Sequence, residues 1–151
     1  MKLAEALSLR VELKNRINSL KDRIKLSAKI QEGDEPVDNV VELRKELDNV
    51  LGEFEDLIYR INLTNVKASV DGNCLTYLIA QRDVLTKRVS ILNDIVSYVA
   101  GNDTRFGRNE IRYIRTIDVK TLRNDLNMYS KQLRELDIKI QSLNWTVELI
   151  E

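Results

Sequence analysis

The stretch "VVELRKELDNVLGEFEDLIYRI", residues 40–61, places apolar side chains at alternating steps of three and four. This is the spacing of a heptad seam, in which one side of an α-helix packs along a partner helix. It predicts a helix over residues 39–62 that lies against a second helix of similar length. The seam consists of Val40, Leu43, Leu47, Val50, Phe54, Leu57 and Ile61.

Three further segments have helical periodicity and are predicted as helices over residues 2–31, 77–100 and 119–143. The expected inner face of the first consists of Leu3, Ala6, Leu13, Ile17, Leu20, Ile24 and Ala28. That of the third helix consists of Leu78, Leu85, Leu92, Ile95 and Val99. The last helix has a second complete seam: Val119, Leu122, Leu126, Tyr129, Leu133, Leu136, Ile140 and Leu143.

Turn and capping residues separate these segments. Gly33 and Pro36 end the first helix, because glycine adopts a left-handed conformation readily and proline cannot continue a helix. Asp71-Gly72 is a strong turn signal. The predicted N-caps of the helices that follow are Asp38, Thr76 and Asp118.

Alternating apolar and polar residues predict short strands over 66–70 and 110–117, with a third possible over 145–150. The predicted fold is therefore mainly α. It comprises two long antiparallel helical hairpins, four helices in all and coiled-coil-like, with a small β element of two or three short strands. We expect residues 1–151 to form a single helical domain.

The first two helices carry opposite charge. Residues 1–31 hold eight Lys and Arg and three Asp and Glu, a net charge of +5, whereas residues 32–56 hold two and ten, a net charge of −8. A short connection makes neighbouring helices antiparallel, so a basic helix is expected to pack on an acidic one. Individual surface pairs contribute only a few tenths of a kcal/mol, so the charges favour this pairing while the seam stabilises it.

The apolar face of the first helix is wider than a seam, because Leu7, Leu9, Val11 and Leu26 lie outside it. Four helices could close a bundle within one chain, or the hairpins could bury their faces in neighbouring subunits. The wide face favours the second arrangement. We therefore predict a self-assembling protein, a homo-oligomer of unknown cellular role.

Composition limits the chemistry. The sequence contains no histidine and one cysteine, Cys74, which removes Ser–His and Cys–His nucleophile pairs and most zinc sites. We expect no enzyme activity, cofactor or metal. The net charge is zero, which argues against a dedicated nucleic-acid binder. No run of about 18 apolar residues predicts a membrane span, and the charged N-terminus lacks a secretory apolar core, so a cytoplasmic location is expected.

An arginine-rich stretch, "TRFGRNEIRYIRTIDV", residues 104–119, contains Arg105, Arg108, Arg112 and Arg115. Guanidinium groups bind phosphate and carboxylate in bidentate fashion. One interpretation is that these arginines pair with the acidic helix of the same or a neighbouring chain. The alternative function is a binding module for a phosphorylated small molecule or RNA.

Several motifs, "QEGDEP" (31–36), "INLTN" (61–65), "EIRYIRTIDV" (110–119) and "LNWTVEL" (143–149), resemble the septicolysin-like family of small bacterial proteins. The resemblance runs from end to end and implies no established activity or catalytic residues. The family label suggests an oxygen-labile cytolysin, which makes pore formation a second alternative function.

The same resemblance points to a set of small polar residues beside an aromatic ring, each expected just beyond a helix end. They either cap the helix C-termini or form a small polar pocket with the arginine strand as its wall. These candidate ligand-binding residues are Asn62, Thr64, Asn65, Asn144, Trp145 and Thr146.

Overall fold

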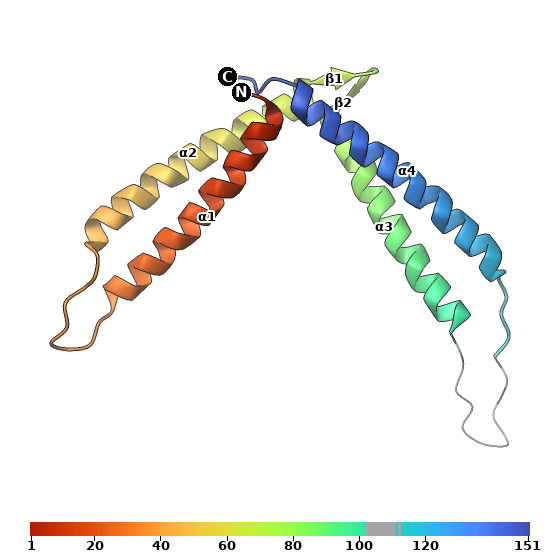
Figure 1. The fold of residues 1–151 in the computed structure, drawn as a ribbon, viewed down its shortest axis with the longest axis horizontal. Helices are drawn as coiled ribbons and strands as arrows, with labels where there is room; N and C mark the ends of the chain where they lie inside the picture. The colour runs from red at the N-terminus through yellow and green to blue at the C-terminus, as the bar shows by residue number, and fades with distance from the viewer. Residues whose placement is uncertain (102–110, 112) are drawn as a thin grey trace. The chain divides into compact units, whose positions relative to one another are not determined.

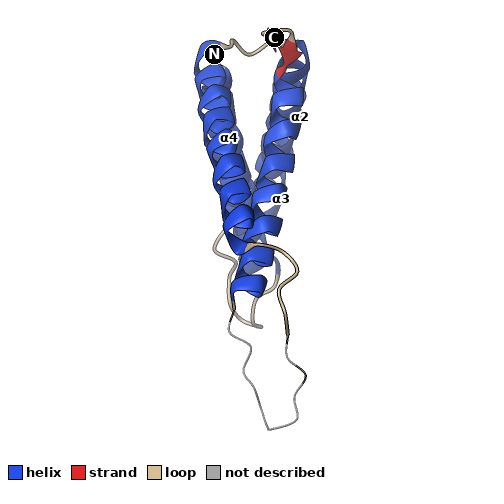
Figure 2. Ribbon diagram, turned by 90° about the vertical axis from the view of Figure 1, so that its right-hand side faces the viewer, coloured by secondary structure: helices blue, strands red, loops and turns tan. Residues whose placement is uncertain are grey.

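Helices make up most of the chain in a computed structural model that describes residues 1–101, 111 and 113–151 (Figure 2). The elements in order are α1 (Leu3–Ala28), α2 (Val40–Lys67), β1 (Ser69–Val70), β2 (Asn73–Cys74), α3 (Leu75–Ala100) and α4 (Val119–Thr146). Figure 1 shows α1 beside α2 and α3 beside α4. The mainly α fold with two helical hairpins is confirmed.

The chain divides into two compact units. Met1–Leu75 together with Gln141–Glu151 forms the first, called here the α1–α2 unit. Thr76–Ile140 forms the second, the α3–α4 unit. Each is described by itself.

The seam of α2 is the core of the α1–α2 unit, as predicted from its spacing. The backbones of α1 and α2 lie close together along the hairpin. Buried seam residues of α2 are Leu43, Val50, Leu57 and Ile61, and those of α1 include Leu3, Ala6, Leu13 and Leu20. One position of the predicted α1 face is wrong, because Ser27 is buried near the helix end while Ala28 is exposed.

The N-cap of α2 is Asn39, and the prediction of Asp38 is wrong by one residue. The side-chain oxygen of Asn39 accepts hydrogen bonds from the N–H groups of Val41 (3.0 Å) and Glu42 (3.3 Å). Asp38 instead accepts two hydrogen bonds from the Arg23 guanidinium, at 2.8 and 3.1 Å. This pairing lowers the pKa of the Asp38 carboxyl below its ordinary value and ties the loop to α1.

The other predicted caps have different outcomes. Asp118 is confirmed, since its carboxylate accepts from the N–H of Thr121 at 3.1 Å, next to the beginning of α4. The Thr121 hydroxyl also donates to this carboxylate, at 2.9 Å, and this bond together with that of the N–H lowers the pKa of Asp118. Thr76 is wrong as a cap because α3 already begins at Leu75.

The turn at Asp71-Gly72 is confirmed. Both residues have positive φ, 51° and 80°, and they join β1 to β2 in antiparallel register, with Val70 opposite Asn73. Two central residues of positive φ are the signature of a tight hairpin turn, which explains why glycine stands there.

The strand predictions are otherwise wrong. α2 continues to Lys67 and includes Val66, so only Ser69–Val70 of the predicted strand 66–70 forms a strand. Trp145 and Thr146 end α4, and only an isolated bridge between Glu148 and Lys2 lies in the 145–150 stretch. In the described part of 110–117, residues 111 and 113–117, the chain forms no strand. Of the predicted strands, only the end of 66–70 has a neighbouring strand, β2, with which it pairs.

The α3–α4 hairpin is less tightly packed than the α1–α2 hairpin. The backbones of α3 and α4, both fully described, come close at few points. Leu78, Leu122 and Ile140 are buried, while Leu85, Leu92 and Val99 are half-buried. Ile95, predicted on the inner face of α3, is exposed. The hairpin therefore leaves apolar surface uncovered.

Candidate functional site

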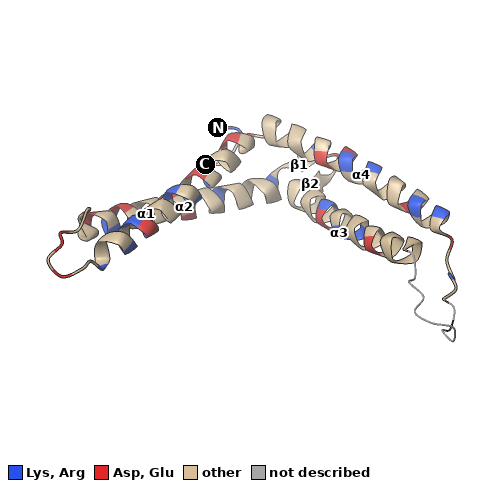
Figure 3. Cartoon of the chain, turned by 60° about the horizontal axis from the view of Figure 1, so that its bottom comes forward, with Lys and Arg blue, Asp and Glu red and all other residues tan. Residues whose placement is uncertain are grey.

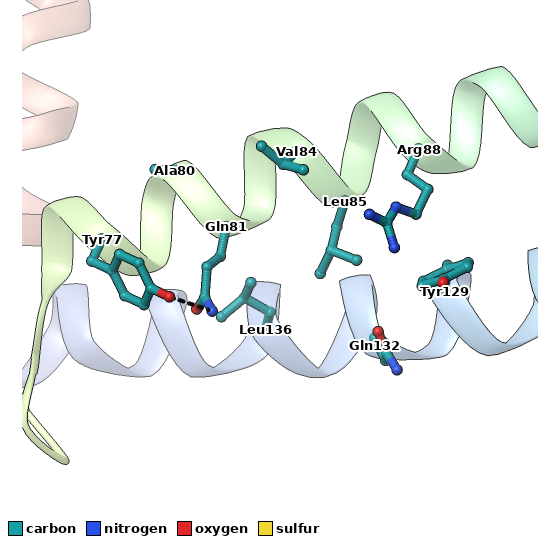
Figure 4. A pocket seen from close by; sticks show the side chains of 9 residues that line it. All are labelled: Tyr77, Ala80, Gln81, Val84, Leu85, Arg88, Tyr129, Gln132 and Leu136. Atoms are coloured by element: carbon teal, nitrogen blue, oxygen red, sulfur yellow. Dashed lines mark hydrogen bonds between the residues drawn. The ribbon is translucent and has the colours of Figure 1, made fainter.

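A groove lies between α3 and α4, with a volume of about 430 Å³. Figure 4 shows Leu85 and Leu136 between the two helices, with Tyr77 and Gln81 toward one end and Arg88 and Tyr129 toward the other. The remaining lining residues are Ala80, Val84 and Gln132. Most of these groups are alkyl, aromatic or amide, and they suit an apolar partner.

An exposed apolar row runs along α3 beside this groove. Tyr77, Val84, Ile91 and Tyr98, called here the α3 strip, are spaced exactly seven residues apart and are 50%, 60%, 51% and 85% exposed. A seven-residue spacing keeps these side chains on one side of the helix. α3 is also the most apolar of α1, α2, α3 and α4, yet it buries little along its length. The α3 strip is therefore a single exposed apolar row at one heptad position of α3.

Two polar contacts organise the groove. The Arg88 guanidinium carbon lies 4.7 Å from the ring centroid of Tyr129, a cation–π contact that joins α3 to α4. Gln81 donates from its amide to the Tyr77 hydroxyl at 3.4 Å (Figure 4). Arg88 also provides a positive charge beside the apolar α3 strip.

The two units carry opposite net charge. The α3–α4 unit has twelve Lys and Arg and eight Asp and Glu, a net charge of +4. The α1–α2 unit has twelve Lys and Arg and sixteen Asp and Glu, a net charge of −4. Figure 3 shows that Lys and Arg positions alternate with Asp and Glu positions along the helices. The difference is therefore a property of each unit as a whole.

A hydrogen-bonded cluster in the α1–α2 unit holds the C-terminal segment. The Thr64 hydroxyl, fully buried, donates to the Arg60 carbonyl at 2.7 Å and accepts from the Ile150 N–H at 3.0 Å. Arg60 Nε donates to the Ile150 carbonyl at 3.0 Å. The Leu149 N–H donates to the Met1 carbonyl at 2.8 Å. Thr64 thus anchors the C-terminal segment to α2.

Charge adds to this attachment. Glu148 forms ion pairs with Lys2 and with the amino group of Met1. Both cations lower the pKa of the Glu148 carboxyl below its ordinary value, with the Lys2 hydrogen bond as the larger cause. Lys2 Nζ also donates to the Thr146 carbonyl at 3.1 Å.

The polar residues singled out from the sequence lie inside helices, so their expected position beyond the helix ends is wrong. Asn62, Thr64 and Asn65 belong to α2, and Asn144, Trp145 and Thr146 to α4. Asn62, Trp145 and Thr146 are exposed. Asn65 Oδ1 is buried and has no hydrogen-bond partner among the described residues. Their role in ligand binding stays a prediction.

Of the arginine stretch, Arg105, Arg108 and Arg112 lie outside the described residues. Arg115 is exposed, in a segment without regular secondary structure. Binding of a phosphorylated ligand or RNA by these arginines therefore also stays a prediction.

The residues that sequence reasoning missed are those of the α3 strip. Their seven-residue spacing is visible in the sequence. However, α3 has two apolar rows, and the prediction assigned the row containing Leu78 and Leu85 to the inner face of the helix. In the described part of the chain, no group of three or more acidic or cysteine side chains is placed to hold a metal ion. No described helix is both long enough and apolar enough to cross a membrane.

The fold defines a mainly α protein of two helical hairpins, with an exposed apolar strip on α3. The chain belongs to a family of unknown function, DUF6847, whose model matches residues 10–149. A crystal structure of a functionally unknown conserved protein from Corynebacterium diphtheriae is similar to it, with 36% sequence identity, a TM-score of 0.90 and coverage of 99% of each chain. A comparison with curated proteins found no match.

These findings correct the resemblance to the septicolysin-like family, which is wrong. Both the family match and the structural neighbour belong to proteins of unknown function, and neither points to a cytolysin. Pore formation rested on that resemblance and loses its basis with it.

Proposed function

We propose that this chain is a non-catalytic helical protein that acts by binding a second copy of itself through the α3 strip. The observation that carries the proposal is the exact seven-residue repeat of Tyr77, Val84, Ile91 and Tyr98, each at least half exposed. Apolar residues repeated every seven positions stay on one side of a helix and present one heptad position to a second helix. A monomer would leave the α3 strip in water at a cost in solubility.

The energy available from the α3 strip is sufficient to matter. Complete burial of a valine or isoleucine side chain contributes about 1.5–3 kcal/mol, so a half-exposed one can still contribute about 1 kcal/mol. Four such positions contribute roughly 4 kcal/mol, and a two-fold pair buries them twice. Association itself costs about 4–15 kcal/mol, so a stable pair must bury further surface, such as the groove beside the strip.

The residue types in the groove favour binding over catalysis. Its walls are mainly alkyl and aromatic, its amides belong to Gln81 and Gln132, and its one cation lies on the Tyr129 ring. The histidine that most often serves as general base is missing from the sequence. Alkyl and aromatic side chains are what a helix-packing surface needs, whereas acid–base catalysis would need a titratable group placed to transfer a proton.

Ile91→Asp tests the proposal, because it places a charge in the middle of the α3 strip. Sedimentation equilibrium should show a self-associating wild type and at least 100-fold weaker association of I91D, since an unpaired charge is costly to bury. The matched control is Ile138→Asp, which changes an exposed isoleucine of α4 that does not line the groove. I138D should associate like the wild type, and circular dichroism should show equal helicity in all three. Equal association of I91D and wild type would refute the proposal.

A further inference from the structure

We infer that the α3 strip of one copy packs on the α1–α2 unit of a second copy, so that unlike units pair. This inference rests on the proposed self-association and names the surface that the strip binds. The alternative is pairing of like units, α3–α4 on α3–α4, and the two arrangements differ in charge.

The net charges favour unlike units. Two α3–α4 units would bring +4 against +4, whereas an α3–α4 unit on the α1–α2 unit of a second copy brings +4 against −4. Complementary charge across an interface selects the partner and excludes the wrong one more than it adds affinity. The apolar surfaces supply the affinity, and the charges decide between the two arrangements.

The α1–α2 unit also presents an apolar surface for this contact. Leu47, Leu51, Phe54 and Ile58, called here the α2 strip, follow steps of four, three and four and therefore share one side of α2. Leu51 is 42% exposed, and the other three are half-buried. Leu47 and Phe54 also belong to the seam of α2, so the strip is open mainly at Leu51.

At their centres the two strips are flanked by charges of opposite sign, whereas Asp94, three residues after Ile91, and Arg44, three before Leu47, carry the other sign. Asp48 and Glu55 stand three residues before and four after Leu51, and both are exposed. On α3, Lys87 and Arg88 stand between Val84 and Ile91, three or four residues from each, and they too are exposed. This is the pattern of a helix pair in which flanking charges set partner choice.

The inferred assembly is a dimer in which the α3–α4 unit of each copy contacts the α1–α2 unit of the other, so every contact is made twice about a two-fold axis. In that dimer each α3 strip packs on the α1–α2 unit of the other copy.

Two charge-reversal variants test the inference. The first is Lys87→Glu with Arg88→Glu, and the second is Asp48→Lys with Glu55→Lys. Each by itself places like charges across the proposed contact, twice per dimer, and should weaken self-association by about tenfold at low salt. An equimolar mixture should associate with wild-type affinity, because in the mixed dimer both contacts are again between opposite charges.

The mixture also controls for damage to the groove. K87E/R88E loses the Arg88–Tyr129 contact, and a defect from that loss would not be restored by adding the second variant. Sedimentation velocity with one variant fluorescently labelled measures the mixed dimer, and added salt should reduce the differences between variants.

Other outcomes would overturn the inference. Stronger self-association of K87E/R88E, with D48K/E55K unchanged, would show that like units pair; the proposed function would stand and the inference would fail. Mixing without restoration would also refute it. A wild type that is monomeric throughout would refute the proposed function itself.

Discussion

Replacing Thr64 with valine removes one hydroxyl from the contact between α2 and the C-terminal segment and leaves the side-chain shape nearly unchanged. Thr64 is 0% exposed, and its hydroxyl accepts from the Ile150 N–H at 3.0 Å. Ile150 also accepts from Arg60 Nε at 3.0 Å, so the segment stays close when the hydroxyl is lost. The Ile150 N–H then loses its protein partner in a part-buried position.

The expected cost follows from that unpaired donor. A buried polar group without its partner costs about 1–3 kcal/mol, and Ile150 is half-buried, so we expect about 2 kcal/mol. For a chain of this length, 1 kcal/mol corresponds to a shift in Tm of about 2–4 °C. T64V should therefore unfold about 4–8 °C below the wild type.

Urea denaturation followed by circular dichroism gives the free energy of unfolding, and hydrogen exchange reports on the Ile150 amide directly. The matched control is Thr86→Val. The Thr86 hydroxyl donates to the carbonyl of Arg82 at 2.9 Å. Like the hydroxyl of Thr64, it therefore bonds the carbonyl four residues earlier, but Thr86 is exposed. T86V should change stability by less than about 0.5 kcal/mol. Equal stability of T64V and T86V, with unchanged Ile150 exchange, would refute the anchoring role of Thr64.

Three further predictions concern the loop before α2 and the chain ends. Asn39→Ala removes the α2 cap and should destabilise by about 1 kcal/mol in the same urea assay; no change would mean that the cap is not needed. Ser27→Ala removes the buried hydroxyl that accepts from the Asp38 N–H at 3.1 Å, and should cost about 1 kcal/mol, while an unaltered midpoint would contradict this. The lowered pKa of Glu148 means that its contribution is present above its ordinary value of 4.5 and is lost as the pH falls through the lowered pKa. Glu148→Gln should thus be less stable than wild type at neutral pH, with the difference closing on acidification; a difference independent of pH would disprove the pairing with Lys2.

Much of the fold could be predicted because the seams of α2 and α4 are regular. Steps of three and four fix the helical period and the buried side, and that information is local. The helix ends were harder to predict. α2 extends five residues beyond its predicted end at 62, to Lys67, and only Ser69–Val70 of the alternating residues 66–70 pairs with a strand. A short alternating pattern by itself does not supply the hydrogen bonds of a sheet.

The candidate site was less predictable for two physical reasons. α3 has one apolar row through Leu78 and Leu85 and another through Val84 and Ile91, and periodicity does not tell which one faces α4. The contact of Thr64 with Ile150 joins residues 86 positions apart, and no local pattern marks it. Both features depend on tertiary packing.

The most direct test of the account is the molar mass of the wild-type chain in solution across a range of concentrations. Sedimentation equilibrium should give about 35 kDa, twice the 17.5 kDa of one chain, at micromolar concentration, and I91D should give the mass of one chain. A wild-type mass of 17.5 kDa at every concentration would contradict the account, because the α3 strip would then bind no second copy.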